Sequence, residues 1–142
     1  QLQNNRLTSL EGVENLRTLR SLRVEGNALG PCVKLIGRLT ALTQVDVSNN
    51  GLERLDGFGT LVHLEEVNLS GNRLKSLDAL GACKRISELD VSDNLLTDVA
   101  LPHIKALSRL DVLNLEGNAL TSLEKLPALE DLTELSVARN RL

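Results

Sequence analysis

Two cysteines and two histidines are the residue types in this chain that most often act as nucleophiles, general bases or metal ligands: Cys32, Cys83, His63 and His103. Their spacing does not match a zinc site, and no nucleophile has a candidate base near it in the sequence. No glycine-rich phosphate loop is present. The acids Asp90 and Asp93 do not follow the spacing of a calcium loop. The sequence therefore predicts a protein that is not an enzyme and has no metal and no cofactor.

The composition favours a repetitive aliphatic stack. Of the 142 residues, 33 are leucine and only Phe58 is aromatic, and the net charge is −3. A slightly acidic chain without a run of lysine or arginine is not typical of nucleic-acid or membrane-surface binders. No apolar stretch approaches the ~18–20 residues that a membrane span requires. We therefore expect no nucleic acid, no membrane and no small-molecule substrate as a partner.

Asparagine recurs in a fixed frame along the whole chain, at steps of 22, 23, 22, 22, 24 and 22 residues. The full frame reads L-x-x-L-x-L-x-x-N-x-L, as in residues 64–74. Its asparagines are Asn5, Asn27, Asn50, Asn72, Asn94, Asn118 and Asn140. A carboxamide both donates and accepts hydrogen bonds. We therefore expect these side chains to point inward as a structural ladder that satisfies turn backbone in their own and the adjacent coil.

Each repeat combines two hydrophobic periods. The alternation in Leu89–Val91 is typical of a short strand with one buried face, and its recurrence in one direction predicts a parallel sheet. The connections have apolar residues three apart, as at Leu77, Leu80, Cys83 and Ile86 and again over residues 123–132. This step favours 3₁₀ turns over an α-helix.

Two connections are longer and predict fuller helical turns. One residue is added at Gly30–Cys32 and two are added at Thr97–Ala100. We expect Pro102 near the start of the second helical turn, where its missing N–H carries no cost.

These features resemble the leucine-rich repeat. The 22-residue length and the step-of-three connections resemble the intracellular subclass typified by the regulatory subunit of protein phosphatase 1, axonemal dynein light chain 1 and tubulin-folding cofactor E. The resemblance implies an α/β fold: a right-handed curved solenoid with a parallel β-sheet on its concave face and 3₁₀ or short α segments on its convex face. We expect one domain over residues 1–142, with about six repeats, that starts and ends in mid-repeat as part of a longer protein.

The resemblance also implies a function, a non-catalytic scaffold for protein–protein interaction in the cytoplasm. A phosphatase-regulatory adaptor and an axonemal or cytoskeletal adaptor are narrower versions of this prediction. A structural spacer inside a larger protein is the alternative of a different class.

Partner contacts are expected on the outward positions of the strands, where acidic and polar residues prevail and aromatic residues are missing. Such a surface predicts a protein partner with a basic surface and binding that weakens with salt. The candidate contacts are Arg23, Gln44, Asp46, Glu65, Glu66, Asn68, Glu88, Asp90, Asp111, Val112, Asn114 and Glu134. Glu65, Glu66, Glu88 and Asp111 depart most from the repeat pattern, and Val112 is expected to be an exposed apolar contact. Two alternatives stay open: the Asp and Asn positions are only short side chains common in the repeat, or the partner binds another face.

Overall fold

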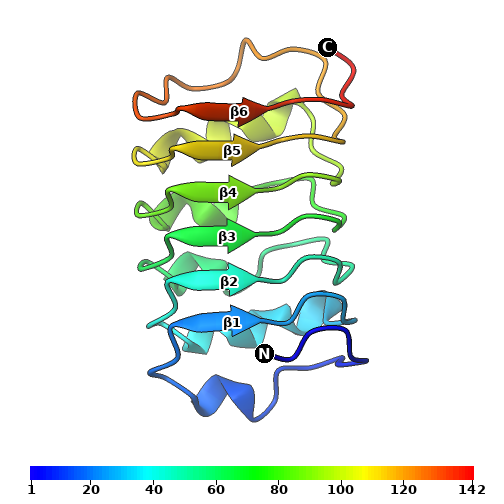
Figure 1. The fold of residues 1–142 in the computed structure, drawn as a ribbon, viewed down its shortest axis with the longest axis vertical. Helices are drawn as coiled ribbons and strands as arrows, with labels where there is room; N and C mark the ends of the chain where they lie inside the picture. The colour runs from blue at the N-terminus through cyan, green and yellow to red at the C-terminus, as the bar shows by residue number, and fades with distance from the viewer.

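A parallel sheet of six short strands forms one side of the molecule in the computed structural model, which describes residues 1–142 (Figure 1). The strands are β1 (Ser21–Arg23), β2 (Gln44–Asp46), β3 (Glu66–Asn68), β4 (Glu88–Asp90), β5 (Val112–Asn114) and β6 (Glu134–Ser136). They lie in sequence order, and each pairs in register with the next, so that equivalent residues of successive repeats are neighbours. The sheet therefore converts the sequence repeat into columns of side chains.

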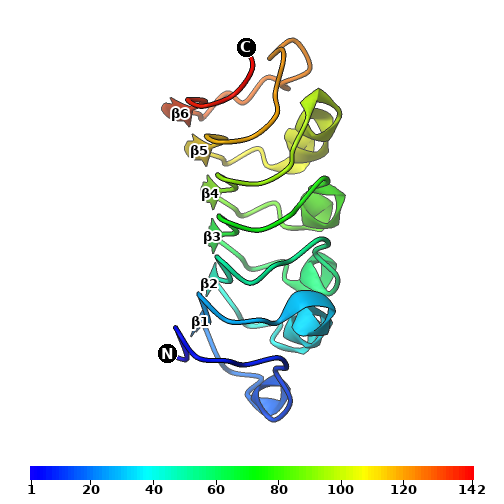
Figure 2. The same cartoon turned by 90° about the vertical axis from the view of Figure 1, so that its right-hand side faces the viewer.

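Five 3₁₀ segments form the opposite layer. They are η1 (Val13–Asn15), η2 (Gly30–Arg38), η3 (Phe58–Thr60), η4 (Asp78–Ala82) and η5 (Asp98–Ala106). Figure 2 shows the strands along one gently concave side and the helical segments along the other. The predicted fold class, a curved solenoid with a parallel sheet on the concave face, is confirmed.

A single apolar core runs between the two layers. The 33 buried residues of this core form one continuous cluster, to which both strands and connections contribute. Phe58, Leu61 and Leu64 are completely buried and keep the step of three that the sequence predicts. No helix in the structure combines the length and the apolar character needed to cross a membrane.

The two longer connections are 3₁₀ segments of nine residues each, and neither contains an α-helix. The apolar step explains this result, because Leu101, Ile104 and Leu107 are buried and three residues apart. The expected position of Pro102 was wrong, since it lies in the middle of η5. Pro102 and Val99 are both exposed. Pro102 has no N–H to donate to the carbonyl three residues before it, that of Val99.

The connection between β5 and β6 forms no regular 3₁₀ segment, in contrast to the prediction for residues 123–132. Two isolated bonds of the 3₁₀ type remain, from the Leu126 N–H to the Leu123 carbonyl (2.9 Å) and from the Leu132 N–H to the Leu129 carbonyl (3.2 Å). Pro127 lies between these two bonds and has no N–H to donate to a further one.

Candidate partner-binding face

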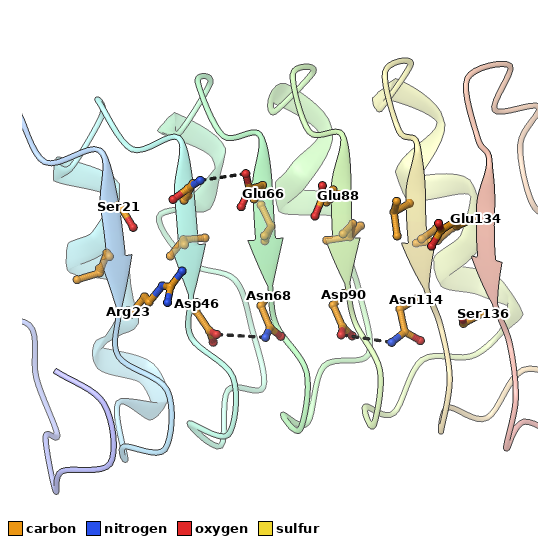
Figure 3. A pocket seen from close by; sticks show the side chains of 17 residues that line it. Ser21, Arg23, Asp46, Glu66, Asn68, Glu88, Asp90, Asn114, Glu134 and Ser136 are labelled. Atoms are coloured by element: carbon orange, nitrogen blue, oxygen red, sulfur yellow. Dashed lines mark hydrogen bonds between the residues drawn. The ribbon is translucent and has the colours of Figure 1, made fainter. Parts of the chain in front are cut away.

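The outward side chains of the six strands line a shallow groove of about 550 Å³. They form two rows across the sheet, seen in Figure 3. The first row contains Ser21, Gln44, Glu66, Glu88, Val112 and Glu134. The second row contains Arg23, Asp46, Asn68, Asp90, Asn114 and Ser136. Between the rows runs the central residue of each strand, because successive residues of a strand point to opposite faces. This residue is buried in β1 to β5, whereas Leu135 of β6 is 40% exposed.

The middle of the second row is joined in pairs by hydrogen bonds between coils. The Asn68 carboxamide donates to Asp46 Oδ2 (3.2 Å), and the Asn114 carboxamide donates to Asp90 Oδ2 (3.2 Å) (Figure 3). Asp46 Oδ1 also accepts from the backbone N–H (2.9 Å) and the hydroxyl (2.7 Å) of Ser48. These four side chains are thus engaged within the sheet, which favours a structural role for them.

Asp90 repeats this arrangement two coils further on. Its Oδ1 atom accepts from the backbone N–H (2.9 Å) and the hydroxyl (2.6 Å) of Ser92, and both Ser48 and Ser92 are buried. The carboxylates of Asp46 and Asp90 therefore anchor the turn that follows each strand.

The side chains of the first row make fewer hydrogen bonds within the sheet than those of the second row. Glu66 accepts one hydrogen bond, from the Gln44 carboxamide (2.9 Å). Glu88 and Glu134 are exposed, and their carboxylates make neither a hydrogen bond nor an ion pair. These two residues flank Val112 in the sheet register.

Val112 is half-buried and not exposed as expected. Figure 3 shows the Glu134 side chain directed back towards β5. Val112 stands between Glu88 and Glu134 in the register of the sheet, and these neighbours cannot be seen within one repeat.

Glu65 and Asp111 lie one residue before β3 and β5 and do not line the groove. Both are exposed, and the Asp111 carboxylate accepts a hydrogen bond from the Thr133 hydroxyl of the next coil. Two of the four acids that the sequence ranked highest therefore lie at the rim, and only Glu66 and Glu88 of that set face the groove.

The two arginines near the ends of the sheet differ in their surroundings. Arg23 is exposed on β1 and forms no ion pair. Arg139 donates hydrogen bonds to Glu116 Oε1 (2.9 Å) and Asp93 Oδ2 (3.3 Å), and these bonds, to Glu116 first, raise the pKa of its guanidinium. Only Arg23 is therefore a free cation at the groove.

The repeated asparagines point into the turns that follow the strands. Asn72 Oδ1 accepts from the N–H groups of Asn50 (3.1 Å) and Leu52 (3.0 Å) in the preceding coil. Its Nδ2 group donates to the carbonyls of Val47 (3.1 Å) and Leu69 (2.8 Å). Similar sets involve Asn27, Asn50, Asn94, Asn118 and Asn140. Asn5 differs, since it is exposed and bonds only its own coil.

The residue before each repeated asparagine has a left-handed backbone, a feature that the sequence analysis missed. Along the stack these residues alternate between a side chain and none: Asn4, Gly26, Asn49, Gly71, Asp93, Gly117 and Arg139. A Cβ atom on Gly71 would overlap Asn49 Oδ1, and one on Gly117 would overlap Asp93 Oδ1. The alternation was visible in the sequence, because "Asn-Asn" or "Asp-Asn" and "Gly-Asn" take turns over residues 49–118.

Of the nucleophile and base types, the structure brings together Ser76 and His103, with Ser76 Oγ 3.3 Å from His103 Nδ1. The Ser76 hydroxyl also donates to Asp78 Oδ1 (2.9 Å). Cys83 is completely buried in the core, and burial raises the pKa of its thiol to about 11. His103 Nδ1 accepts from the Leu77 N–H (3.3 Å). No group of three or more His, Cys, Asp and Glu side chains is placed to hold a metal ion.

Known proteins share the repeat and the fold of this chain. A family model described as leucine-rich repeats (two copies) matches residues 40–82 and 62–106. No curated protein sequence matches the chain. An internalin (InlF) of Listeria monocytogenes superposes with a TM-score of 0.86 at 22% identity, over 92% of this chain and 38% of the internalin.

Two further solved structures are similar. A leucine-rich repeat protein of Leptospira interrogans has a TM-score of 0.84 at 26% identity, over 96% of this chain and 36% of that one. The leucine-rich repeat ectodomain of the Arabidopsis thaliana receptor kinase GASSHO1/SCHENGEN3 has a TM-score of 0.70 at 28% identity, over 90% of this chain and 16% of that one. Residues 40–106 are therefore leucine-rich repeats, and the chain has the fold of a leucine-rich repeat solenoid.

Proposed function

We propose that this chain is a non-catalytic scaffold that binds a protein partner through the groove of its sheet. The observation that carries the proposal is the groove itself, to which all six strands contribute outward side chains. Glu88 and Glu134 lie there exposed and without a partner inside the chain. Side chains that the fold does not use for its own stability are available for a partner.

The charge of the groove favours a basic partner. Five carboxylates line it, those of Asp46, Glu66, Glu88, Asp90 and Glu134, against the single guanidinium of Arg23. No aromatic side chain lines the groove. Binding should therefore depend more on electrostatic complementarity than on aromatic anchors, and salt should weaken it.

The size of the groove and one structural relative support a protein as the occupant. Strands about 4.8 Å apart make a six-strand surface about 24 Å long, which matches a helix or a small domain. The ectodomain of GASSHO1/SCHENGEN3 was solved in complex with CASPARIAN STRIP INTEGRITY FACTOR 2.

The narrower predictions continue as proposals. These are membership of the intracellular subclass, a cytoplasmic location, an adaptor role of the phosphatase-regulatory or axonemal type, and a single domain within a longer protein. The alternative, a structural spacer, is supported by the hydrogen-bonded pairs of the second row. Those side chains stabilise neighbouring coils without any binding partner.

Charge reversal separates a scaffold from a spacer. The triple variant Glu66→Lys, Glu88→Lys, Glu134→Lys should reduce recovery of captured proteins from a lysate by about tenfold or more, measured by quantitative mass spectrometry. The matched control reverses three exposed glutamates of the connections, Glu53→Lys, Glu124→Lys and Glu130→Lys, and should retain the captured proteins. Thermal unfolding of both variants checks that the fold persists. Equal recovery by both variants would favour the spacer.

A further inference from the structure

We propose that the occupant of the groove is an α-helix that lies across the six strands, along the axis of the stack. Its basic side chains would meet Glu66, Glu88 and Glu134, and an apolar side chain would meet Val112. This inference rests on the proposed function and adds the secondary structure and the residue pattern of the partner.

The hydrogen bonds of the sheet leave the first row as the contact row. The carboxylates of Asp46 and Asp90 are satisfied by the paired asparagines and the serines of their own turns. In the first row, by contrast, Glu88 and Glu134 have no bond to lose when a cation approaches. A partner therefore gains most where its cations face this row.

The order of residues in the first row defines what the partner must present. Glu66, Glu88, Val112 and Glu134 stand on four consecutive strands in direct register. Val112 keeps part of its apolar surface accessible between two carboxylates. The complementary partner thus carries two cations, one apolar residue and one further cation, in that order along the stack.

The spacing of the strands matches a helix and not an extended chain. A helix presents one face once per 5.4 Å turn, which differs from the 4.8 Å strand spacing by only ~0.6 Å per coil. Over the three intervals from Glu66 to Glu134 the mismatch is about 2 Å, which flexible lysine or arginine side chains can absorb. An extended chain presents one face about every 6.7 Å, so it would be out of step by about 4 Å after two strands.

The helix therefore has basic residues at positions i, i+4 and i+11 and an apolar residue at i+7. Arg23 lies two strands before Glu66, at the end of the groove formed by β1. A partner that reaches this end should carry a neutral or acidic residue there, because a cation would be repelled. The groove thereby distinguishes the two ends of the helix.

Designed peptides test this inference by fluorescence anisotropy. The probe is an alanine-based peptide of about 18 residues with lysine at i, i+4 and i+11 and leucine at i+7. One control has the same composition with lysines at i, i+5 and i+10, on three sides of the helix. A second control keeps the pattern but has a central proline, which breaks the helix. The wild-type chain should bind the patterned peptide at least about tenfold more tightly than either control.

Paired variants locate the contact. Glu88→Gln with Glu134→Gln should remove most of the preference for the patterned peptide, whereas Glu53→Gln with Glu124→Gln should leave it unchanged. Equal affinity for the patterned and the rotated peptide, or for the patterned and the proline-broken peptide, would overturn the inference. If those affinities are equal while the charge-reversed groove still loses its captured proteins, the scaffold function holds and only the helix is wrong. If capture does not depend on the groove acids, the scaffold function itself fails.

Discussion

At the scale of single residues, the repeated asparagine is a polar side chain that the core can tolerate. Asn72 is 6% exposed and bonds two N–H groups and three carbonyls, which belong to its own coil and the preceding one. A buried backbone group that loses its partner costs about 1–3 kcal/mol. The asparagine therefore stabilises the turn of its own coil and the turn before it at once.

The substitution Asn72→Leu should lower the free energy of unfolding by at least about 1–3 kcal/mol, because it leaves buried backbone groups unpaired. Urea denaturation would measure this loss. The control is Asn5→Leu, since Asn5 is exposed and accepts no bond from another coil, and its loss should be clearly smaller. Equal losses for the two variants would refute a ladder role for Asn72.

The residues with a left-handed backbone, one before each repeated asparagine, show a second constraint at this scale. Gly71 has φ +65°, and the space beside it is filled by the side chain of Asn49 from the preceding coil. Gly51 has nearly the same φ, +67°, but no atom lies within 4 Å of the position its Cβ would take. The two glycines therefore separate backbone strain from steric overlap.

We expect Gly51→Ala to cost about 1–2 kcal/mol, the strain of a left-handed backbone. Gly71→Ala should cost about 0.5–1.5 kcal/mol more, because the new Cβ displaces the exposed side chain of Asn49 from its position. Adding Asn49→Gly to Gly71→Ala should recover only the additional loss of unfolding free energy that the overlap causes. A double-mutant cycle of unfolding free energies would measure this recovery. A cycle without coupling would show that the alternation of glycine along this column has no steric cause.

At the scale of elements, a side chain at the start of η5 fastens the last connection, which has no helix of its own. Asp98 accepts from the Thr121 hydroxyl (2.5 Å) and from the N–H groups of Thr121 (2.8 Å) and Ser122 (3.2 Å). These bonds, with the Thr121 hydroxyl first, hold the pKa of the Asp98 carboxyl below its usual value of 3.8. The carboxylate thus links the start of η5 to the start of the connection that follows β5.

A lowered pKa makes this fastening dependent on pH. The stabilisation is fully present above the unfolded-state pKa, near 3.8, and is lost as the pH falls through the lower folded-state value. The difference in unfolding free energy between wild type and Asp98→Asn should therefore be largest above about pH 4 and shrink in more acidic solution. Glu124→Gln removes an equal charge from a side chain without a hydrogen bond and serves as the control. A difference that stays constant down to the acid limit would contradict the assignment.

The helical elements themselves follow from the spacing of apolar residues. A step of three places every third side chain on one line of a 3₁₀ segment, as seen for Phe58 and Leu61. The same step did not produce a segment after β5, where Pro127 interrupts the run, although η5 continues through Pro102. Apolar spacing therefore predicts which side faces the core but does not by itself decide whether a regular segment forms.

At the scale of the whole molecule, register turns isolated repeat positions into a surface. Glu66, Glu88, Val112 and Glu134 are 22, 24 and 22 residues apart in the chain but stand on adjacent strands. The acidic groove is therefore a property of the stack, and no single coil contains it. The proposed binding of a basic helix belongs to this scale, since it needs at least four strands in register.

The sequence by itself determined the number of coils, the parallel sheet and the line of buried leucines. Each of these follows from residues close together in one repeat, and a period of two or three is independent of the neighbouring coils. Tertiary structure decided which outward side chains are free. Asn68 bonds Asp46, Asn114 bonds Asp90, and Thr133 bonds Asp111, and each pair joins residues 22 or 24 apart. Only the stacking of coils brings such partners within hydrogen-bond distance, and for that reason Glu88 and Glu134 stand out as available in the fold and not in the repeat.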